Sequence, residues 1–215
     1  MRILVTGFEP FGGATMNPAL EAVRRLPATV AGAEVVTVKI SVVFGRDIEA
    51  LGAAVSELRP DACVCIGHAR GRTHITPEFV GINYAHAHIP DNAGNQPLAR
   101  PIVEGGPDAY FTTLPVHAMA AHMKEAGIPA AVSYTAGTFC CNELLYGLLH
   151  LCATEYPAMR GGFIHVPYAT EQAAELGDGT PSMSVDMMVR GLTLALEAII
   201  AHPEGDIAAA GGTEC

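Results

Sequence analysis

Apolar residues occur along this chain in short continuous runs, and the segments between the runs show helical spacing. Uninterrupted runs of this length that are rich in β-branched residues are typical of strands buried on both faces of a sheet. We predict strands at residues 1–6, 34–41, 62–66, 75–83, 130–134 and 161–166.

The intervening segments carry signals for the starts and ends of helices. Asn17 before Pro18 provides a capping side chain followed by a proline at the first helical position. Further along, apolar residues recur at helical intervals until Pro60 ends the pattern. We predict helices from Asn17 to about Arg25, from Ile48 to Leu58, from Pro107 to Gly127 with a kink or restart at Pro115, over 140–153, and from about Ser182 to His202, with a turn-rich stretch over 90–97.

Strands and helices therefore alternate almost from end to end, without an internal repeat, a long linker or a break in composition. Such alternation is typical of an α/β fold, in which helices cover both faces of a mostly parallel sheet. Ligands of these folds bind in the loops that follow the carboxyl ends of the strands. The chemistry is therefore expected where loops and helices begin after the predicted strands.

The composition narrows the class of protein. Half of the 215 residues are hydrophobic and 16% are charged, which supplies a substantial core and argues against a disordered or fibrous chain. The net charge of −10 and the lack of a Lys/Arg run argue against nucleic-acid binding. No segment offers about 18 consecutive apolar residues, and the start of the chain lacks the pattern of a secretory signal. We therefore expect no membrane span and a cytoplasmic location.

Six cysteines are spread through the sequence, and in a reducing cytoplasm we expect thiols. Cys63 and Cys65 share one face of an apolar strand, without a second pair at metal-binding spacing, which favours simple burial. Cys140 and Cys141 stand where a helix begins after the small-residue turn at 133–138. Unpaired backbone N–H groups and the helix dipole should lower the pKa of a thiol there and stabilise an oxyanion. On spacing alone, either cysteine is a nucleophile or a packing residue.

A thiol nucleophile needs a base and a group that orients the base. His165 ends the predicted strand that follows the cysteine helix, so it can reach the same edge of the sheet. Glu78 stands in an otherwise apolar extended run, where an unpaired carboxylate would be costly. A core histidine and a solvated edge carboxylate are equally acceptable interpretations of these two residues taken alone.

Two other patterns are less specific. The loop at residues 6–13 lacks both the dinucleotide glycine fingerprint and a phosphate-loop lysine, which counts against a nucleotide-binding oxidoreductase. It predicts a tight turn that places Phe8 and Phe11 beside the sheet edge or in the core. Four histidines lie close together in sequence without the spacing that specifies a zinc site: His68, His74, His86 and His88. We expect no metal.

Taken together, the motifs of the chain resemble those of the pyroglutamyl peptidase I family, also called pyrrolidone-carboxylate peptidases. The resemblance runs from the first predicted strand to the last helix. It implies one α/β/α sandwich with a mostly parallel twisted sheet over residues 1–208, followed by a flexible tail at 209–215. The matching blocks are Thr6-Gly7-Phe8-Glu9-Pro10-Phe11-Gly12-Gly13 with Asn17-Pro18, Gly71-Arg72 with Ile75-Thr76-Pro77-Glu78, Ile89-Pro90-Asp91-Asn92 with Gly94-Asn95-Gln96-Pro97, Ser133-Tyr134-Thr135-Ala136-Gly137-Thr138-Phe139 with Cys141-Asn142, and Arg160-Gly161-Gly162-Phe163-Ile164-His165.

The resemblance implies a cysteine exopeptidase that hydrolyses the bond after an N-terminal pyroglutamyl residue through a thioester acyl-enzyme. The family triad falls on Glu78, Cys141 and His165, and the family nucleophile directly precedes an asparagine, as Cys141 does. Cys140 is then a packing residue. Because pyroglutamate is a neutral lactam, its pocket calls for apolar walls and a few hydrogen bonds. The family positions that form this pocket fall on Phe8, Phe11, Asn17, Val42, His68, Ile89 and Phe139.

Three positions depart from the family pattern. His68 stands where glutamine is frequent, His88 where arginine is frequent, and Val42 where threonine also occurs. His68 changes the hydrogen bonding offered to the lactam, and His88 replaces a permanent cation near the cleft. The alternative is therefore a catalytically impaired homologue that only binds pyroglutamyl peptides. The resemblance also implies peptide substrates as partners, a homo-oligomer (dimer or tetramer), and no nucleic acid, membrane, metal or organic cofactor.

Overall fold

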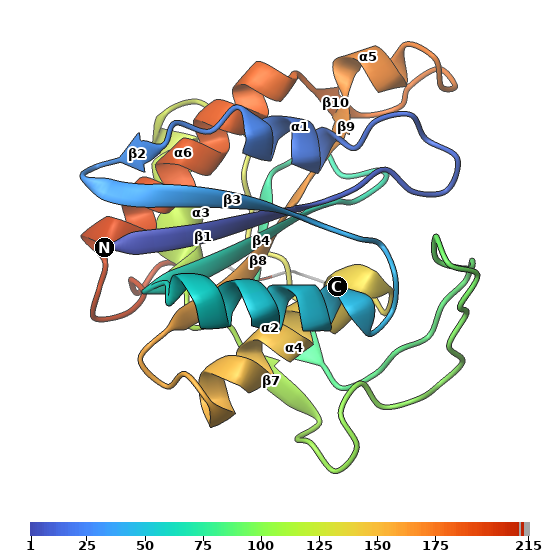
Figure 1. Ribbon diagram of the computed structural model, residues 1–215. Helices are drawn as coiled ribbons and strands as arrows, with labels where there is room; N and C mark the ends of the chain where they lie inside the picture. The colour runs from blue at the N-terminus through green and yellow to red at the C-terminus, as the bar shows by residue number, and fades with distance from the viewer. Residues whose placement is uncertain (211, 213–215) are drawn as a thin grey trace.

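A twisted sheet of six strands forms the middle layer of the computed structural model, which describes residues 1–210 and residue 212 (Figure 1). The four inner strands are parallel, and each edge strand runs antiparallel to its neighbour. The strands at 1–6, 34–41, 62–66 and 161–166 are thereby confirmed. In spatial order, the sheet consists of β2 (Thr29–Val30), β3 (Ala33–Ile40), β1 (Arg2–Phe8), β4 (Ala62–His68), β8 (Arg160–Val166) and β5 (Thr76–Glu78).

Helices cover both faces of this sheet (Figure 1). One face packs against α1 (Pro18–Arg24), α3 (Val116–Glu125) and α6 (Val185–Ala201). The other face packs against α2 (Arg46–Leu58) and α4 (Cys140–Thr154). Since neighbouring strand residues point to opposite faces and both faces are buried, the inner strands are continuously apolar. The expected α/β/α sandwich is confirmed.

The helix boundaries follow the capping signals in the sequence. The side chain of Asn17 accepts a hydrogen bond from the backbone N–H of Ala19 at 3.0 Å, and Pro18 is the first residue of α1. The helix α2 ends at Leu58, two residues before Pro60. These local signals mark where the two helices begin or end.

The prediction of a helix from Pro107 is wrong for the residues before Val116. Residues Ala109–Phe111 form β7, which pairs antiparallel with β6 (Val80–Ile82), and α3 begins only at Val116. The nine residues from Pro107 to Pro115 are too few and too interrupted to form a helix, and β6 offers them a pairing edge from a distant part of the chain. The expected restart at Pro115 is confirmed as the true start.

Two other expected strands differ in detail. The stretch 75–83 is divided into β5 and β6 at Phe79. Instead of a continuous strand at 130–134, Ala130 and Ser133 form isolated parallel bridges to Ile75 and Glu78. This segment therefore extends the sheet beyond β5 by a partial strand.

The C-terminal part adds small elements that the hydrophobic pattern does not indicate. After β8 come β9 (Tyr168–Ala169), the short helix α5 (Thr170–Ala173) and β10 (Ser182–Met183), which pairs parallel with β9. Because β10 takes the residues expected to begin the last helix, α6 begins at Val185. Of the tail expected at 209–215, residues 211 and 213–215, including Cys215, lie outside the described residues.

Candidate active site

The end of β5, the carboxyl end of β8 and the start of α4 bring Glu78, His165 and Cys141 to one region of the fold. In the antiparallel pair of β5 and β8, Glu78 lies opposite Phe163, and His165 lies opposite Thr76. The side chains of Glu78 and His165 therefore share one face as diagonal neighbours. The Nδ1 atom of His165 is 2.7 Å from Oε1 of Glu78, and both side chains are buried. Glu78 is thus a buried hydrogen-bond partner of the imidazole rather than a solvated edge residue.

Arg72 neutralises the buried carboxylate. Its Nη1 atom lies 2.8 Å from the same Oε1 of Glu78 and also contacts the Thr76 hydroxyl, and its Nη2 donates to the backbone carbonyl of Thr135 at 3.0 Å. A wholly buried carboxylate without a cation would be costly, and this ion pair offsets part of that cost. Arg72 is a site residue that spacing alone does not identify. Its signals in the sequence are its place six residues before an isolated carboxylate and its membership of the matching block that begins at Gly71.

The two adjacent cysteines at the start of α4 face different surroundings. Cys140 is 1% exposed in the core, whereas Cys141 is partly exposed. Cys141 and His165 line one open cleft of about 500 Å³, and Cys140 does not reach it. This geometry distinguishes the two thiols, which the sequence spacing leaves open, and favours Cys141 as the reactive one.

The thiol pKa differs from the expectation of a lowered value. Burial, with the nearby Glu78 carboxylate as a second cause, raises the pKa of Cys141 to about 12, although the Arg72 guanidinium acts in the opposite direction. Burial also lowers the pKa of His165, against the hydrogen bond to Glu78 that favours its charged form. Burial therefore shifts the thiol pKa in the direction opposite to the one expected from the helix N-terminus, and both shifts favour the neutral forms of the thiol and the imidazole.

Two buried acidic side chains, Asp47 and Glu143, lie at the starts of α2 and α4, and Glu143 joins the two helices. The Oε2 atom of Glu143 accepts a hydrogen bond from the backbone N–H of Gly45 at 2.9 Å, and Oδ1 of Asp47 accepts from Ile48 N–H at 2.8 Å. Burial, and next the Glu143 carboxylate, raise the pKa of Asp47 to about 9. At neutral pH the Asp47 carboxyl therefore keeps its proton, and its Oδ2 atom has no hydrogen-bond partner among the described residues.

A small aromatic pocket lies beside Cys141. Six of the seven expected substrate-binding residues line this pocket: Phe8, Phe11, Asn17, Val42, His68 and Phe139. The seventh, Ile89, lines the adjoining cleft. The ring centroids of Phe11 and Phe139 are 6.2 Å apart. Phe44, which the motifs do not single out, packs edge-on against Phe139 at 5.1 Å. The pocket thus has flat apolar walls.

Two polar side chains complete the pocket in different ways. The side chain of Asn17 already forms hydrogen bonds within the protein: its amide donates to the Glu9 carbonyl at 3.1 Å, and its oxygen caps α1. The ring centroids of His68 and Tyr168 are 4.3 Å apart with the rings tilted by 57°, and the buried Nε2 atom of His68 has no hydrogen-bond partner among the described residues. Burial, and next the charge of Arg70, lower the pKa of His68 to about 4. His68 therefore presents a neutral ring nitrogen to the pocket.

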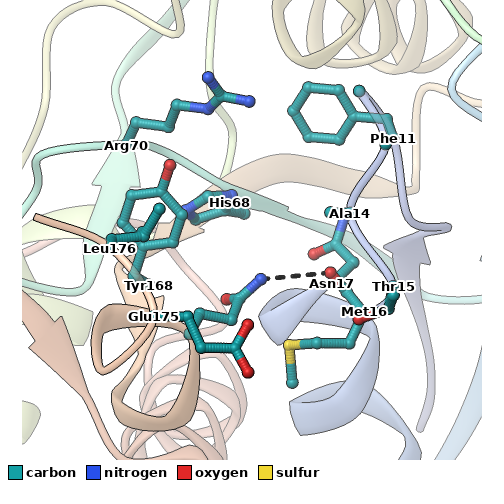
Figure 2. A pocket seen from close by; sticks show the side chains of 13 residues that line it. Phe11, Ala14, Thr15, Met16, Asn17, His68, Arg70, Tyr168, Glu175 and Leu176 are labelled. Carbon is teal, nitrogen blue, oxygen red and sulfur yellow. Dashed lines mark hydrogen bonds between the residues drawn. The ribbon is translucent and has the colours of Figure 1, made fainter.

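A second cavity, of about 380 Å³, lies on the other side of Phe11, Asn17 and His68 (Figure 2). Loop residues 11–17 form one wall, and Tyr168 with the segment around α5 forms the other. The two walls are joined by a hydrogen bond from the Gln172 amide to the Met16 carbonyl at 3.3 Å, drawn in Figure 2. This cavity and the cleft share Arg70 at their common boundary.

The four neighbouring histidines do not form a metal site. Across residues 1–210 and 212, no group of three or more His, Cys, Asp or Glu side chains has the arrangement that holds a metal ion. The ring nitrogen Nδ1 of His86 instead accepts a hydrogen bond from the Ala99 N–H, and His74 contacts Thr73.

Among the helices of residues 1–210 and 212, none is both long and apolar enough to cross a bilayer.

The chain is similar to a well-defined set of known proteins. The family model described as pyroglutamyl peptidase matches residues 1–202. A pyrrolidone-carboxylate peptidase of Levilactobacillus brevis is 51% identical over 205 residues, which cover 95% of this chain and 100% of the relative. Another from Enterococcus faecalis is 49% identical and covers 99% of each chain. The crystal structure of pyroglutamyl peptidase I from Bacillus amyloliquefaciens superposes with a TM-score of 0.94 at 45% identity, covering 97% of this chain and 99% of that one.

Proposed function

The chain belongs to the pyroglutamyl peptidase family, and we propose that it removes N-terminal pyroglutamyl residues from peptides with Glu78, Cys141 and His165 as its catalytic triad. The observation that carries this assignment is the 2.7 Å contact between Glu78 and His165 in a cleft that also exposes Cys141. A nucleophile, a base and a group that orients the base are thereby gathered beside an aromatic pocket.

In the first half of the reaction, the Sγ atom of Cys141 attacks the carbonyl carbon that joins pyroglutamate to the next residue. His165 donates its Nδ1–H to Glu78, so its Nε2 is free to accept the thiol proton during the attack. Because the resting thiol has a raised pKa, proton transfer accompanies bond formation instead of preceding it. A carbon–sulfur bond forms, and His165 then passes the proton to the leaving amine as the carbon–nitrogen bond breaks.

In the second half, water attacks the thioester, with His165 again as the base. Pyroglutamate leaves and the thiol regains its proton, so no metal or organic cofactor takes part. The first backbone N–H groups of α4, around Cys141, have no intrahelical acceptor and are suited to hold the oxyanion.

The pocket suits the acyl group. A lactam is flat and uncharged, and the walls formed by Phe8, Phe11 and Phe139 are apolar. The unpaired Nε2 of His68 supplies a hydrogen-bonding atom that an amide ring can use. The departures at His68, His88 and Val42 leave the triad contacts intact, so the inactive binding homologue is not favoured.

Turnover of a pyroglutamyl anilide, compared with its prolyl analogue, tests the proposal. The prolyl compound has the same ring size but lacks the lactam carbonyl, and it gains a charged ring nitrogen that the apolar walls disfavour. We expect hydrolysis of the pyroglutamyl compound only. Equal turnover of both compounds, or tight binding of pyroglutamyl peptides without turnover, would refute the assignment.

The homo-oligomer and the cytoplasmic location stay predictions from the family resemblance. Sedimentation analysis tests the oligomeric state.

A further inference from the structure

The cleft beside Cys141, which would receive the leaving peptide, is lined by basic side chains although the protein as a whole is acidic. The chain carries a net charge of −10, with 22 acidic residues. Within the part of the chain that the structure describes, no Asp or Glu lines the cleft beside Cys141. Its polar lining consists of basic and imidazole side chains together with threonines. Glu78 lies behind this surface and is fully buried against Arg72 and His165. The cleft is therefore a positively charged site on an acidic molecule.

The two arginines of the cleft differ in what they contact. Arg72 forms an ion pair with Glu78. Arg70 is exposed, and among residues 1–210 and 212 it forms no ion pair and no side-chain hydrogen bond. Its guanidinium carbon lies 5.8 Å from the ring centroid of Phe11, a cation–π geometry that holds the charge beside the aromatic pocket. Arg70 is thus a positioned but unpaired cation.

Arg70 also stands where the leaving peptide must pass. It lines both the cleft and the second cavity, and Figure 2 shows it beside Phe11 at the rim, with His68 below. The acidic side chain of that second cavity, Glu175, lies at the opposite end of the view from Arg70. A peptide whose acyl group occupies the aromatic pocket places its next residue beside Cys141 and therefore near Arg70.

We propose that Arg70 is a specificity-determining residue that binds a carboxylate on the residue after pyroglutamate, so that the preferred substrates are acidic at that position. This inference rests on the proposed function. A guanidinium pairs with a carboxylate through charge-assisted hydrogen bonds, and a locally positive cleft raises the concentration of anionic peptides against the field of an acidic protein. The carboxylate is either an acidic side chain or the free α-carboxylate of a dipeptide.

Substrate pairs of matched size separate these two sources. For the side chain, kcat/KM is measured on pyroglutamyl-glutamate amide and pyroglutamyl-glutamine amide. For the α-carboxylate, the pair is pyroglutamyl-alanine and its amide. Because Arg70 is exposed, we expect the acidic member of at least one pair to be favoured about two- to fivefold, mainly through KM. The preference should fall towards one at about 1 M salt, where charges are screened within a few ångströms.

Three variants test the role of Arg70. Arg70→Met should bring the acidic-to-neutral ratio to about one, and Arg70→Lys should restore most of it. Arg59→Met is the matched control, since Arg59 also lies over an aromatic ring, that of Tyr156 at 5.3 Å, but does not line the cleft. It changes the net charge equally and should keep the wild-type ratio. A wild-type ratio of one or less in both pairs, an unchanged ratio in Arg70→Met, or an equal loss in Arg59→Met would overturn the inference. Absence of turnover for every pyroglutamyl substrate would instead overturn the proposed function and this inference with it.

Discussion

Replacing Gly67 by alanine should displace the Cys141 thiol while leaving the fold intact. Gly67 lies near the carboxyl end of β4, directly beside the site. A Cβ atom built there would lie 3.1 Å from Sγ of Cys141 and only 2.6 Å from Cζ of Phe163. The ring of Phe163 in turn lies 4.8 Å from that of His165. One methyl group therefore pushes on the nucleophile and, through Phe163, on the base.

The sizes of the two effects follow from these contacts. Inserting a methyl group into a packed core costs about 1–3 kcal/mol, which for a chain of this length lowers Tm by roughly 2–12 °C. A displacement of the reacting atoms by about 1 Å can cost about 10²-fold in rate. Since Sγ can yield by only part of that distance, we expect kcat/KM of Gly67→Ala to fall about 10- to 100-fold.

Gly161→Ala is the control, because it overpacks the same sheet away from the cleft. Its Cβ would lie 2.9 Å from Sγ of Cys152 and 3.0 Å from Cγ of Leu148. Both variants should show a similar loss of Tm by calorimetry, whereas Gly161→Ala should keep kcat/KM within about twofold. Wild-type activity in Gly67→Ala, or equal losses of activity in both variants, would refute the placement of the thiol.

Three further predictions concern titratable groups. Glu78→Gln should lower kcat about 10³- to 10⁴-fold, since an amide no longer holds the tautomer of His165; unchanged kcat would contradict the triad. Asp47→Asn should become more stable relative to wild type as pH rises from 5 to 8, by about 1–4 kcal/mol in urea unfolding. The reason is that the unfolded Asp47 releases its proton near pH 4 and the folded one only near 9, so wild-type stability is lost over that range, whereas the amide does not titrate; a constant difference would contradict this. Alkylation of Cys141 by iodoacetamide should rise about tenfold per pH unit between pH 7 and 9 without a plateau, and a plateau below pH 7 would indicate a thiolate–imidazolium pair instead.

The fold could be predicted largely from local signals, because the inner strands are buried on both faces and the helices carry clear caps. The continuous apolar run at 62–66 identifies β4, and Asn17 with Pro18 identifies α1. The segment at 109–111 could not be predicted, since its strand conformation depends on pairing with β6, almost 30 residues away in sequence. Short elements whose partners are distant leave no periodic pattern.

The site could be predicted in its parts but not in its electrostatics. Glu78 and His165 stand out as polar residues in apolar strands, and the antiparallel register of β5 and β8 explains why they meet. Spacing cannot separate Cys140 from Cys141, because only the orientation of the first turn of α4 exposes one and buries the other. The helix N-terminus suggests a lowered thiol pKa, yet burial reverses the sign. Burial is a property of the whole fold, which no local motif contains.

If the thiol of Cys141 is the nucleophile and that of Cys140 is not, the two single alanine variants must differ in activity. We would measure kcat/KM on a pyroglutamyl anilide for Cys141→Ala and Cys140→Ala, with folding of both variants checked by circular dichroism. We expect a loss of about 10³-fold or more in Cys141→Ala and activity within about tenfold of wild type in Cys140→Ala. Full turnover in a folded Cys141→Ala, or its abolition in a folded Cys140→Ala, would contradict this expectation.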